Sequence, residues 1–361
     1  RSTLFPYTTL FRSTNRAGRA VMGSRNRLIW TFVLALAVTA VVCLGLGRFS
    51  VPFLQSLRIL VNAFTPWRLE TTWSDRMESV ILAVRLPRLI GAMLVGLALS
   101  LSGAAYQSLF RNPLVSPDLL GISSGACVGA AFAILLELPA PLVQLSALGT
   151  GLLTVFLTTL IPGLFRNRSS LMLVLSGVIM SGFMSALLGI AKYVADPENH
   201  LASIVYWTMG SFSNVRMKDV LLISPPILAA MVALLLLRWR VNLLSLGDAE
   251  AGSLGVNVRR ARGVTILCST VLTACAVCLC GTIGWAGLIV PHLGRLIVGQ
   301  DNRYLLPMSA VLGALFLVVV DTLARNLTGS EIPLSIITGV LGAPLFVWLL
   351  ARQRARIGDD R

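Results

Sequence analysis

Long apolar runs, separated by short polar and basic segments, occupy most of the chain from Leu28 to Leu350. A helix that crosses a bilayer needs about 20 predominantly apolar residues, and runs near that length recur throughout. They predict about ten spanning helices, at Leu28–Gly47, Leu89–Leu109, Leu119–Leu136, Leu142–Ile161, Leu171–Ala191, Val220–Leu237, Gly263–Gly281, Gly284–Gly299, Tyr304–Leu323 and Ile332–Leu350. The pattern therefore predicts an all-α integral membrane protein.

Composition supports the membrane interpretation and argues against a soluble protein. Hydrophobic residues make up 56% of the 361 residues and charged residues only 12%, about half the charged share of an ordinary soluble domain. A soluble protein of this composition could not cover its surface with polar groups. The net charge of +15 could suggest nucleic-acid binding, but most arginines lie in short gaps between apolar runs, which is typical of membrane proteins.

The basic residues also predict which way the chain crosses the membrane. With the N-terminus inside, the inside loops carry most of the arginines, as the positive-inside rule requires. The long first outside loop, 48–88, is an exception, because loops of that length follow the rule less strictly. An even number of spans then places both termini in the cytoplasm. The inside set is Arg111, Arg166, Arg168, Arg238, Arg240, Arg259, Arg260, Arg262, Arg295, Arg303, Arg352, Arg354 and Arg356.

The first 21 residues differ in character from the rest. The chain does not begin with Met, and Thr3–Ser13 resembles the conceptual translation of a sequencing-library adapter. We therefore expect residues 1–21 to be a disordered artefact. Residues 22–361 are expected to form a single transmembrane domain that begins near Met22.

Two loops are longer than a hairpin needs. The outside loop Asp196–Lys218 contains Tyr206 and Trp207, which suit a short helix at the membrane interface. The inside loop Arg238–Arg262 mixes apolar, glycine and acidic residues between two basic clusters. It could be an amphipathic element docked on a cytoplasmic partner or a solvated connector on the lipid headgroups, and the sequence leaves both open.

The sequence lacks the motifs of an enzyme. A nucleotide-binding phosphate loop needs Gly-x4-Gly-Lys-Ser/Thr, yet neither Lys192 nor Lys218, the only lysines, follows a glycine. No nucleophile–base set accompanies the two histidines, His200 and His292, and His292 is interpreted as a structural group. The six cysteines lie in apolar runs without a neighbouring His or acid, so we expect no metal site and no bound cofactor.

Asp321 is the one acid well inside an apolar run. An ion-coupled carrier usually buries ionisable groups near the middle of the membrane. Asp321 instead lies near the outer end of its run, with Arg325 four residues later. This spacing favours a local Asp–Arg pair on one helix over ion coupling.

Four long blocks carry a family resemblance. They are similar to the permease subunits of iron–siderophore and vitamin B12 ATP-binding-cassette (ABC) importers, and they occur in the same order. The similarity extends from about Leu28 to the C-terminus. The blocks are Arg85–Ala130, which begins RLPR, Leu243–Arg260, Gly281–Pro307 and Glu331–Leu350.

The resemblance implies the architecture of a type II ABC importer permease, with ten helices in each subunit. It further implies a second permease subunit (a homodimer or a paralogue), two cytoplasmic ATPase subunits that bind ATP and Mg, and an external substrate-binding protein. Arg85, Arg88 and Arg325 match family arginines that face the binding protein, and exposed guanidinium groups could grip its glutamates. Stabilisation of the outer helix ends is the alternative for Arg88 and Arg325.

The resemblance also assigns two inside segments. The loop Leu246–Val256 matches the coupling helices that enter a cleft of the ATPase, with a loose EAA-like pattern at Glu250 and Ala251. Gly255 permits a sharp turn between two short helices, and the Ser169–Ser170 turn matches a cytoplasmic gate. The full coupling set is Leu246, Gly247, Asp248, Glu250, Ala251, Leu254, Gly255 and Val256.

These features together predict the permease of an importer that moves an iron(III)–siderophore by alternating access. The same machine carrying vitamin B12 or haem is one alternative. An ion-coupled secondary transporter is an alternative of another class, and a scaffolding membrane protein is a third.

Overall fold

The computed structural model describes the backbone of residues 7–67, 69–165 and 169–359, and side chains within 24–351. The described chain is helical and contains no strand. Its elements are α1 (Tyr7–Gly45), α2 (Phe53–Phe64), α3 (Asp75–Ser79), η1 (Val80–Arg85), α4 (Leu86–Leu109), η2 (Pro117–Leu120), α5 (Ile122–Leu135), α6 (Ala140–Leu164), α7 (Ser170–Val194), η3 (Pro197–Leu201), α8 (Ala202–Met209), α9 (Met217–Leu244), α10 (Asp248–Ser253), α11 (Val258–Cys280), α12 (Ala286–Val298), α13 (Asn302–Asn326) and α14 (Leu334–Asp359).

Each of the ten predicted spans coincides with a helix, which confirms the all-α membrane fold. Within the described residues, seven helices are long and apolar enough to cross a bilayer. Three further runs form shorter apolar helices, namely α5, α12 and the segment Leu334–Leu349 of α14. The predicted helices near 206–207 and within 238–262 are also present, as α8 and α10.

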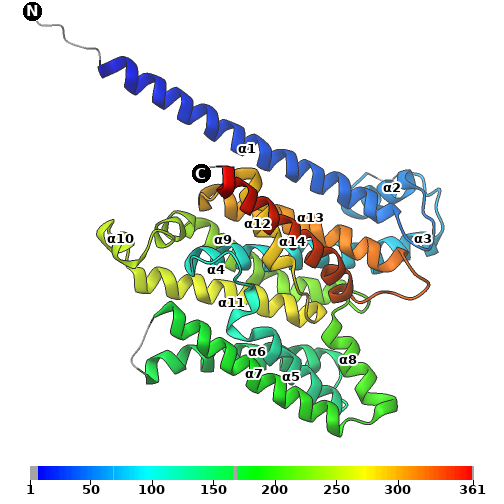
Figure 1. The fold of residues 1–361 in the computed structure, drawn as a ribbon. Coiled ribbons are helices and arrows are strands. Elements are labelled where there is room, and N and C mark those ends of the chain that lie inside the picture. The colour runs from blue at the N-terminus through cyan, green and yellow to red at the C-terminus, as the bar shows by residue number, and fades with distance from the viewer. Residues whose placement is uncertain (1–6, 68, 166–168, 360–361) are drawn as a thin grey trace, which may run out of the picture.

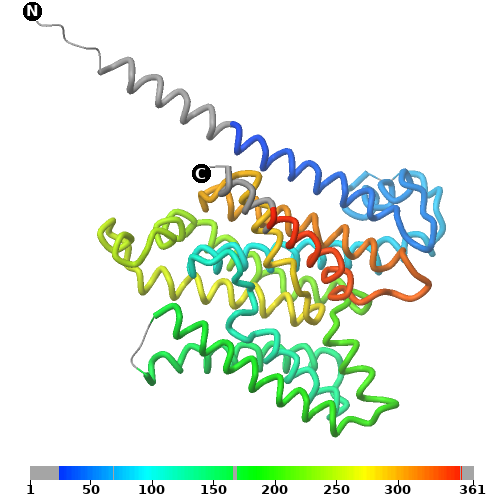
Figure 2. Tube along the Cα trace, in the orientation of Figure 1, coloured from blue at the N-terminus to red at the C-terminus, as the bar shows by residue number. Residues whose placement is uncertain are grey.

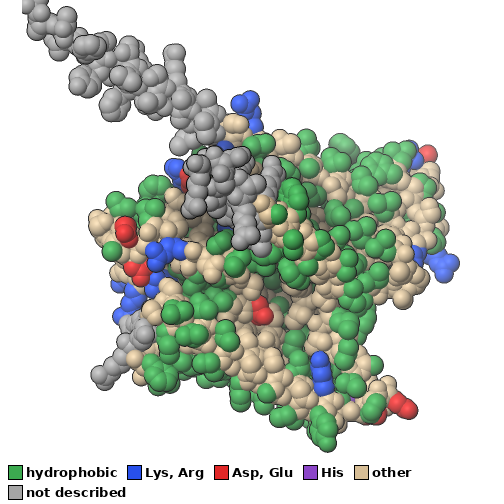
Figure 3. Space-filling view, in the orientation of Figure 1, with side chains coloured by type: hydrophobic (Ala, Val, Ile, Leu, Met, Phe, Trp, Pro, Cys, Tyr) green, Lys and Arg blue, Asp and Glu red, His purple; other side chains and the backbone are tan. Residues whose placement is uncertain are grey.

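The helices form stacked layers (Figure 1). The helices α4, α9 and α11 lie in the middle, with α12, α13 and α14 on one side and α5, α6 and α7 on the other. The tube view shows α10, the end of α6 and the connection from α12 to α13 at one end of the molecule, and α2, α3 and α8 at the opposite end (Figure 2). Arginine side chains gather around α10 (Figure 3), so that end has the charge expected of a cytoplasmic face.

The break between α11 and α12 occurs where the sequence predicts it, at residues 281–285. Gly281 has φ +76°, a conformation that glycine adopts without strain. Non-helical backbone at membrane depth needs hydrogen-bond partners from the protein. Here the amide of Ser211 donates to the carbonyl of Cys280 (2.8 Å), and the hydroxyl of Thr282 donates to the carbonyl of Thr208 (2.6 Å).

The core centres on α4, which makes close crossings at glycines. A Cβ added to Gly96 would lie far closer to the Gly313 carbonyl oxygen on α13 than van der Waals contact allows. One added to Gly103 would collide in the same way with the carbonyl of Gly287 on α12. Small residues allow helix backbones to approach this closely, so these positions set the spacing of the central helices.

We expect Gly96→Val to prevent normal folding. The obstructing atom belongs to backbone, which cannot move aside like a side chain, so the cost is expected at the upper end of the overpacking range, about 3 kcal/mol or more. Gly149→Val on α6 is the matched control, because a Cβ there meets no atom within 4 Å. Thermal unfolding of both variants in detergent tests this prediction, and equal unfolding temperatures would contradict it.

A second glycine contact joins α5 to α6. Cβ atoms on Gly125 and Gly129 would strike Thr154 and Thr150 of α6, so these glycines permit the close approach of α6. Gly121, four residues before Gly125, has φ +78° and joins η2 to α5.

Two features of the N-terminal part differ from expectation. The helix α2, within the first outside loop, was not predicted, because its 12 residues are too few to span a bilayer. The backbone of residues 7–21 is helical as part of α1, where we expected disorder. The adapter interpretation of that segment stays a prediction, since residues 1–6 lie outside the described part.

Candidate functional site

The segment 246–256 projects from the basic end of the molecule as a compact turn around α10. Gly247 precedes α10 with φ +138°, and Gly255 follows it with φ +81°, so a glycine in a left-handed conformation stands at each end. The predicted sharp turn at Gly255 is confirmed. Inside the turn, Ala251 is fully buried, and its carbonyl accepts the amide of Val256 (3.0 Å).

An ion pair and a cap fix this segment to α11. The guanidinium of Arg262 binds both carboxylate oxygens of Asp248, at 2.6 and 2.9 Å. Asn257 caps α11 by accepting the amide of Arg260 (3.0 Å). The partial exposure of this ion pair limits its contribution to stability. Both contacts come from one guanidinium nitrogen, Nη2, and they connect α10 to α11.

The turn presents apolar side chains outward. Leu246 is 55% exposed and Leu254 is 58% exposed, although both stand in a loop that faces an aqueous compartment. An outward leucine on each side of a short, rigid helix is suited to insertion into a cleft of a partner protein. The geometry thus favours the docked element over the solvated connector.

At the opposite end of the molecule, Arg88 joins three elements. Its guanidinium binds Asp321 of α13 at 2.7 Å and Glu331, which precedes α14, at 2.7 Å. Arg325 lies 3.7 Å from the other carboxylate oxygen of Asp321 and donates to the carbonyl of Cys43 (2.9 Å). The predicted pair of Asp321 and Arg325 exists, but the shorter contact of Asp321 is with Arg88.

The nearby Arg85 binds backbone rather than acids. It donates to the carbonyls of Leu44 (2.7 Å), Gly45 (3.1 Å) and Phe49, and so closes the end of α1. Arg48, which the sequence did not single out, donates to the carbonyl of Thr328 (2.8 Å). The arginines therefore connect the ends of α1, α4 and α13 at the face opposite α10.

Our expectation of exposed guanidinium groups at this face is wrong for Arg85 and Arg88, which are only 4% and 5% exposed. Their partners come from segments far apart in the chain. For Arg88 and Arg325 the ion pairs with Asp321 favour the alternative, stabilisation of these helix ends. A direct contact with a binding protein stays a prediction.

The predicted gate residues, Ser169 and Ser170, lie at the start of α7. Ser169 caps α7 by accepting the amide of Met172 (3.2 Å), and Ser170 is the first residue of that helix. Residues 166–168 lie outside the described part, so the gate assignment stays a prediction. Among the described residues, no group of three or more His, Cys, Asp or Glu side chains is arranged to hold a metal ion.

Comparison with known proteins adds independent information. The FecCD transport family matches residues 23–352. The chain is 41% identical to the molybdate import system permease protein of Haemophilus influenzae, over 90% of this chain and 95% of that protein. It is 42% identical to a probable iron chelatin transport system permease protein of Helicobacter pylori, over 91% and 99%.

Two further matches extend the comparison. The chain is 40% identical to the hemin transport system permease protein of Yersinia pestis, over 91% of this chain and 96% of that protein. A solved structure described as a metal-chelate type ABC transporter in an inward-facing conformation matches with a TM-score of 0.80 and 40% identity, over 91% of this chain and 99% of that one.

Proposed function

Because this chain belongs to the FecCD transport family, we propose that it is the permease of an ABC importer that moves an iron(III)–siderophore across the cytoplasmic membrane. The observation that carries the proposal is the family match over residues 23–352. The probable iron chelatin permease of Helicobacter pylori, similar over nearly its whole length, supports the cargo.

The proposed mechanism is alternating access driven by a partner ATPase. ATP binding would close the two ATPase subunits, and the segment 246–256 would transmit that movement to α9 and α11, between which it lies. The ion pair of Asp248 with Arg262 (2.6 Å) supports this role, because it connects α10 to α11 and so couples a movement of α10 to the longer helix. The inward-facing conformation of the similar transporter supports a mechanism of this kind.

The proposed complex contains a second permease subunit, two ATPase subunits and an external binding protein that delivers the cargo. With the basic end in the cytoplasm, both chain termini lie there. The binding protein then docks on the opposite face, whose shape is held by Arg85, Arg88 and Arg325.

Molybdate is a second candidate cargo, favoured by the similarity to the molybdate permease of Haemophilus influenzae. The hemin permease of Yersinia pestis supports haem in the same way, and a cobalamin import permease of Halobacterium salinarum, 38% identical, supports vitamin B12. All four cargoes would use the same coupling, so uptake must be measured to choose among them.

We expect proteoliposomes that hold the permease, its ATPase and its binding protein to take up radioactive iron–siderophore when ATP is supplied on the ATPase side. Unlabelled siderophore should compete, whereas excess molybdate should not. An ATPase variant unable to hydrolyse ATP should abolish uptake, and a protonophore should leave it unchanged. Competition by molybdate but not by siderophore would identify molybdate as the cargo instead. Uptake without the ATPase would overturn the importer mechanism in favour of an ion-coupled carrier.

A further inference from the structure

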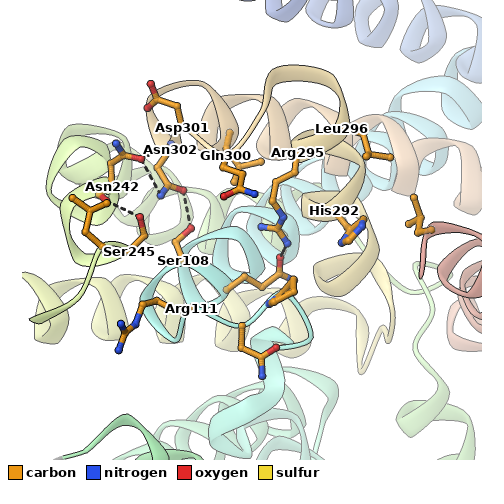
Figure 4. Close-up of a pocket in the computed structure, with 16 residues that line it drawn as sticks. Ser108, Arg111, Asn242, Ser245, His292, Arg295, Leu296, Gln300, Asp301 and Asn302 are labelled. Atoms are coloured by element: carbon orange, nitrogen blue, oxygen red, sulfur yellow. Dashed lines mark hydrogen bonds between the residues drawn. The ribbon is translucent and has the colours of Figure 1, made fainter. Parts of the chain in front are cut away.

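A polar cavity of about 710 Å³ opens at the same end of the molecule as α10. Its walls come from the ends of α4 and α9, from α12, and from the parts of α13 and α14 nearest that end (Figure 4). Leu246 of the segment 246–256 also lines this cavity, and the other lining residues have no part in the assignments made for the importer. Its two most unusual side chains, Arg295 and His292, lie one turn apart on α12.

Arg295 carries a charge that has no counterion among the described residues. Its only side-chain hydrogen bond there goes to the amide oxygen of Gln107, which is neutral. The amide nitrogen of Gln107 in turn donates to the carbonyls of Val115 (3.0 Å) and Leu288 (3.2 Å). Gln107 is therefore fixed by backbone with its oxygen toward Arg295, which positions the guanidinium but does not balance its charge.

His292 is 8% exposed and lines the same cavity. Neither of its ring nitrogens has a hydrogen-bond partner among the described residues, and Nδ1 is closed off from solvent. Its ring packs edge-on against Phe346 of α14, with centroids 6.4 Å apart, which fixes the ring. A buried polar group without a partner is costly, and Nε2 is the nitrogen left to meet a ligand.

The remaining charges around the cavity do not neutralise it. Asp301 is the one acid that lines it, but the guanidinium of Arg303 binds both of its carboxylate oxygens, at 2.6 to 3.0 Å. Arg111 also lines the cavity, and Arg25 approaches Gly299 nearby. The close-up shows Arg295 and His292 beside each other, away from Asp301 (Figure 4), so their side of the cavity is positive.

We propose that this cavity binds an oxyanion, specifically a phosphate group. Arg295 pairs with its charge, since a guanidinium presents several donors suited to phosphate oxygens, and His292 donates a second hydrogen bond from Nε2. The proposal goes beyond cargo transport, because a phosphate group at the cytoplasmic end is available either as free phosphate or as the headgroup of an anionic phospholipid.

Calorimetric titration with inorganic phosphate tests the proposal on the full chain, freed of lipid in a maltoside detergent that contains no phosphate. We expect saturable binding that weakens roughly tenfold or more in Arg295→Gln. Arg260→Gln is the matched control, because it makes the same charge change on an exposed arginine of α11 that does not line the cavity, and it should bind as the parent does.

A second arm distinguishes the source of the phosphate group. The protein is exchanged into micelles containing phosphatidylglycerol, and the lipid retained after washing is measured. Retention that depends on Arg295, without binding of inorganic phosphate, identifies a headgroup site, and the reverse identifies a site for free phosphate.

A third variant guards against misfolding of Arg295→Gln. His292→Phe keeps the ring contact with Phe346 and removes both nitrogens, and it should weaken binding by about threefold to tenfold. The proposal is overturned if neither probe binds. It is equally overturned if Arg260→Gln loses as much binding as Arg295→Gln, or if both cavity variants bind as the parent does.

Discussion

Replacement of Leu254 by glutamate is expected to stop ATP-driven transport while leaving the permease folded. The side chain is 58% exposed, so the substitution should cost the isolated permease no more than about 0.5 kcal/mol. In the complex, the same site would lose the burial of a leucine, worth about 1.5–3 kcal/mol, and would place a carboxylate in an apolar cleft. Binding of the ATPase should weaken roughly tenfold to a hundredfold, which co-purification and uptake assays would measure.

Leu327→Glu provides the control for this result. Leu327 is 61% exposed and follows α13 at the opposite face, so the same chemical change there should not affect association with the ATPase. If Leu254→Glu retains full transport, or if both variants lose the ATPase equally, the segment 246–256 is not the coupling element.

The backbone of the turn can be tested separately at Gly255. Asparagine tolerates the left-handed conformation, whereas a β-branched residue does not. Gly255→Val should therefore uncouple the complex more severely than Gly255→Asn. Equal transport by the two variants would show that the left-handed turn is not required.

Arg88→Met is expected to destabilise the permease strongly. It leaves the buried carboxylate of Asp321 with only the more distant Arg325, 3.7 Å away, and deprives Glu331 of its partner. Removal of one member of a buried ion pair typically costs about 3–5 kcal/mol. Thermal unfolding in detergent would measure the loss.

Arg303→Met is the matched control for burial. It removes an arginine that is also paired with an aspartate at 2.6 Å, but whose side chain is 38% exposed, so it should cost only about 0–1 kcal/mol. The double change Arg88→Met with Asp321→Asn should recover part of the stability, because the buried carboxylate of Asp321 is then gone and only the more exposed Glu331 lacks its partner. Equal destabilisation by Arg88→Met and Arg303→Met would contradict a buried network.

The helices could be predicted from the sequence because each apolar run is a local property of about 20 residues. The break at 281–285 was predictable for the same reason, from glycines within one run. The helix α2 could not be found by length, but its apolar residues recur on one face, so a search for amphipathic periodicity would have detected it.

The arrangement around Arg88 could not be predicted, because its partners are remote in the chain. Asp321 is 233 residues away and Glu331 is 243 residues away. The pattern RLPR marks the arginines, but only the packing of α4 against α13 determines whether they face solvent or acids. The cavity at Arg295 and His292 has the same origin, since five helices contribute to its walls.

The short helices α5 and α12 bear on how the chain enters the membrane during synthesis. At 14 and 13 residues, they are only about 21 and 20 Å long, against a hydrocarbon layer of about 30 Å. Neither helix can cross that layer alone with its backbone polar groups satisfied. We therefore expect each to be inserted together with a longer neighbour that shields the non-helical backbone beside it, α12 with α11 and α5 with α6.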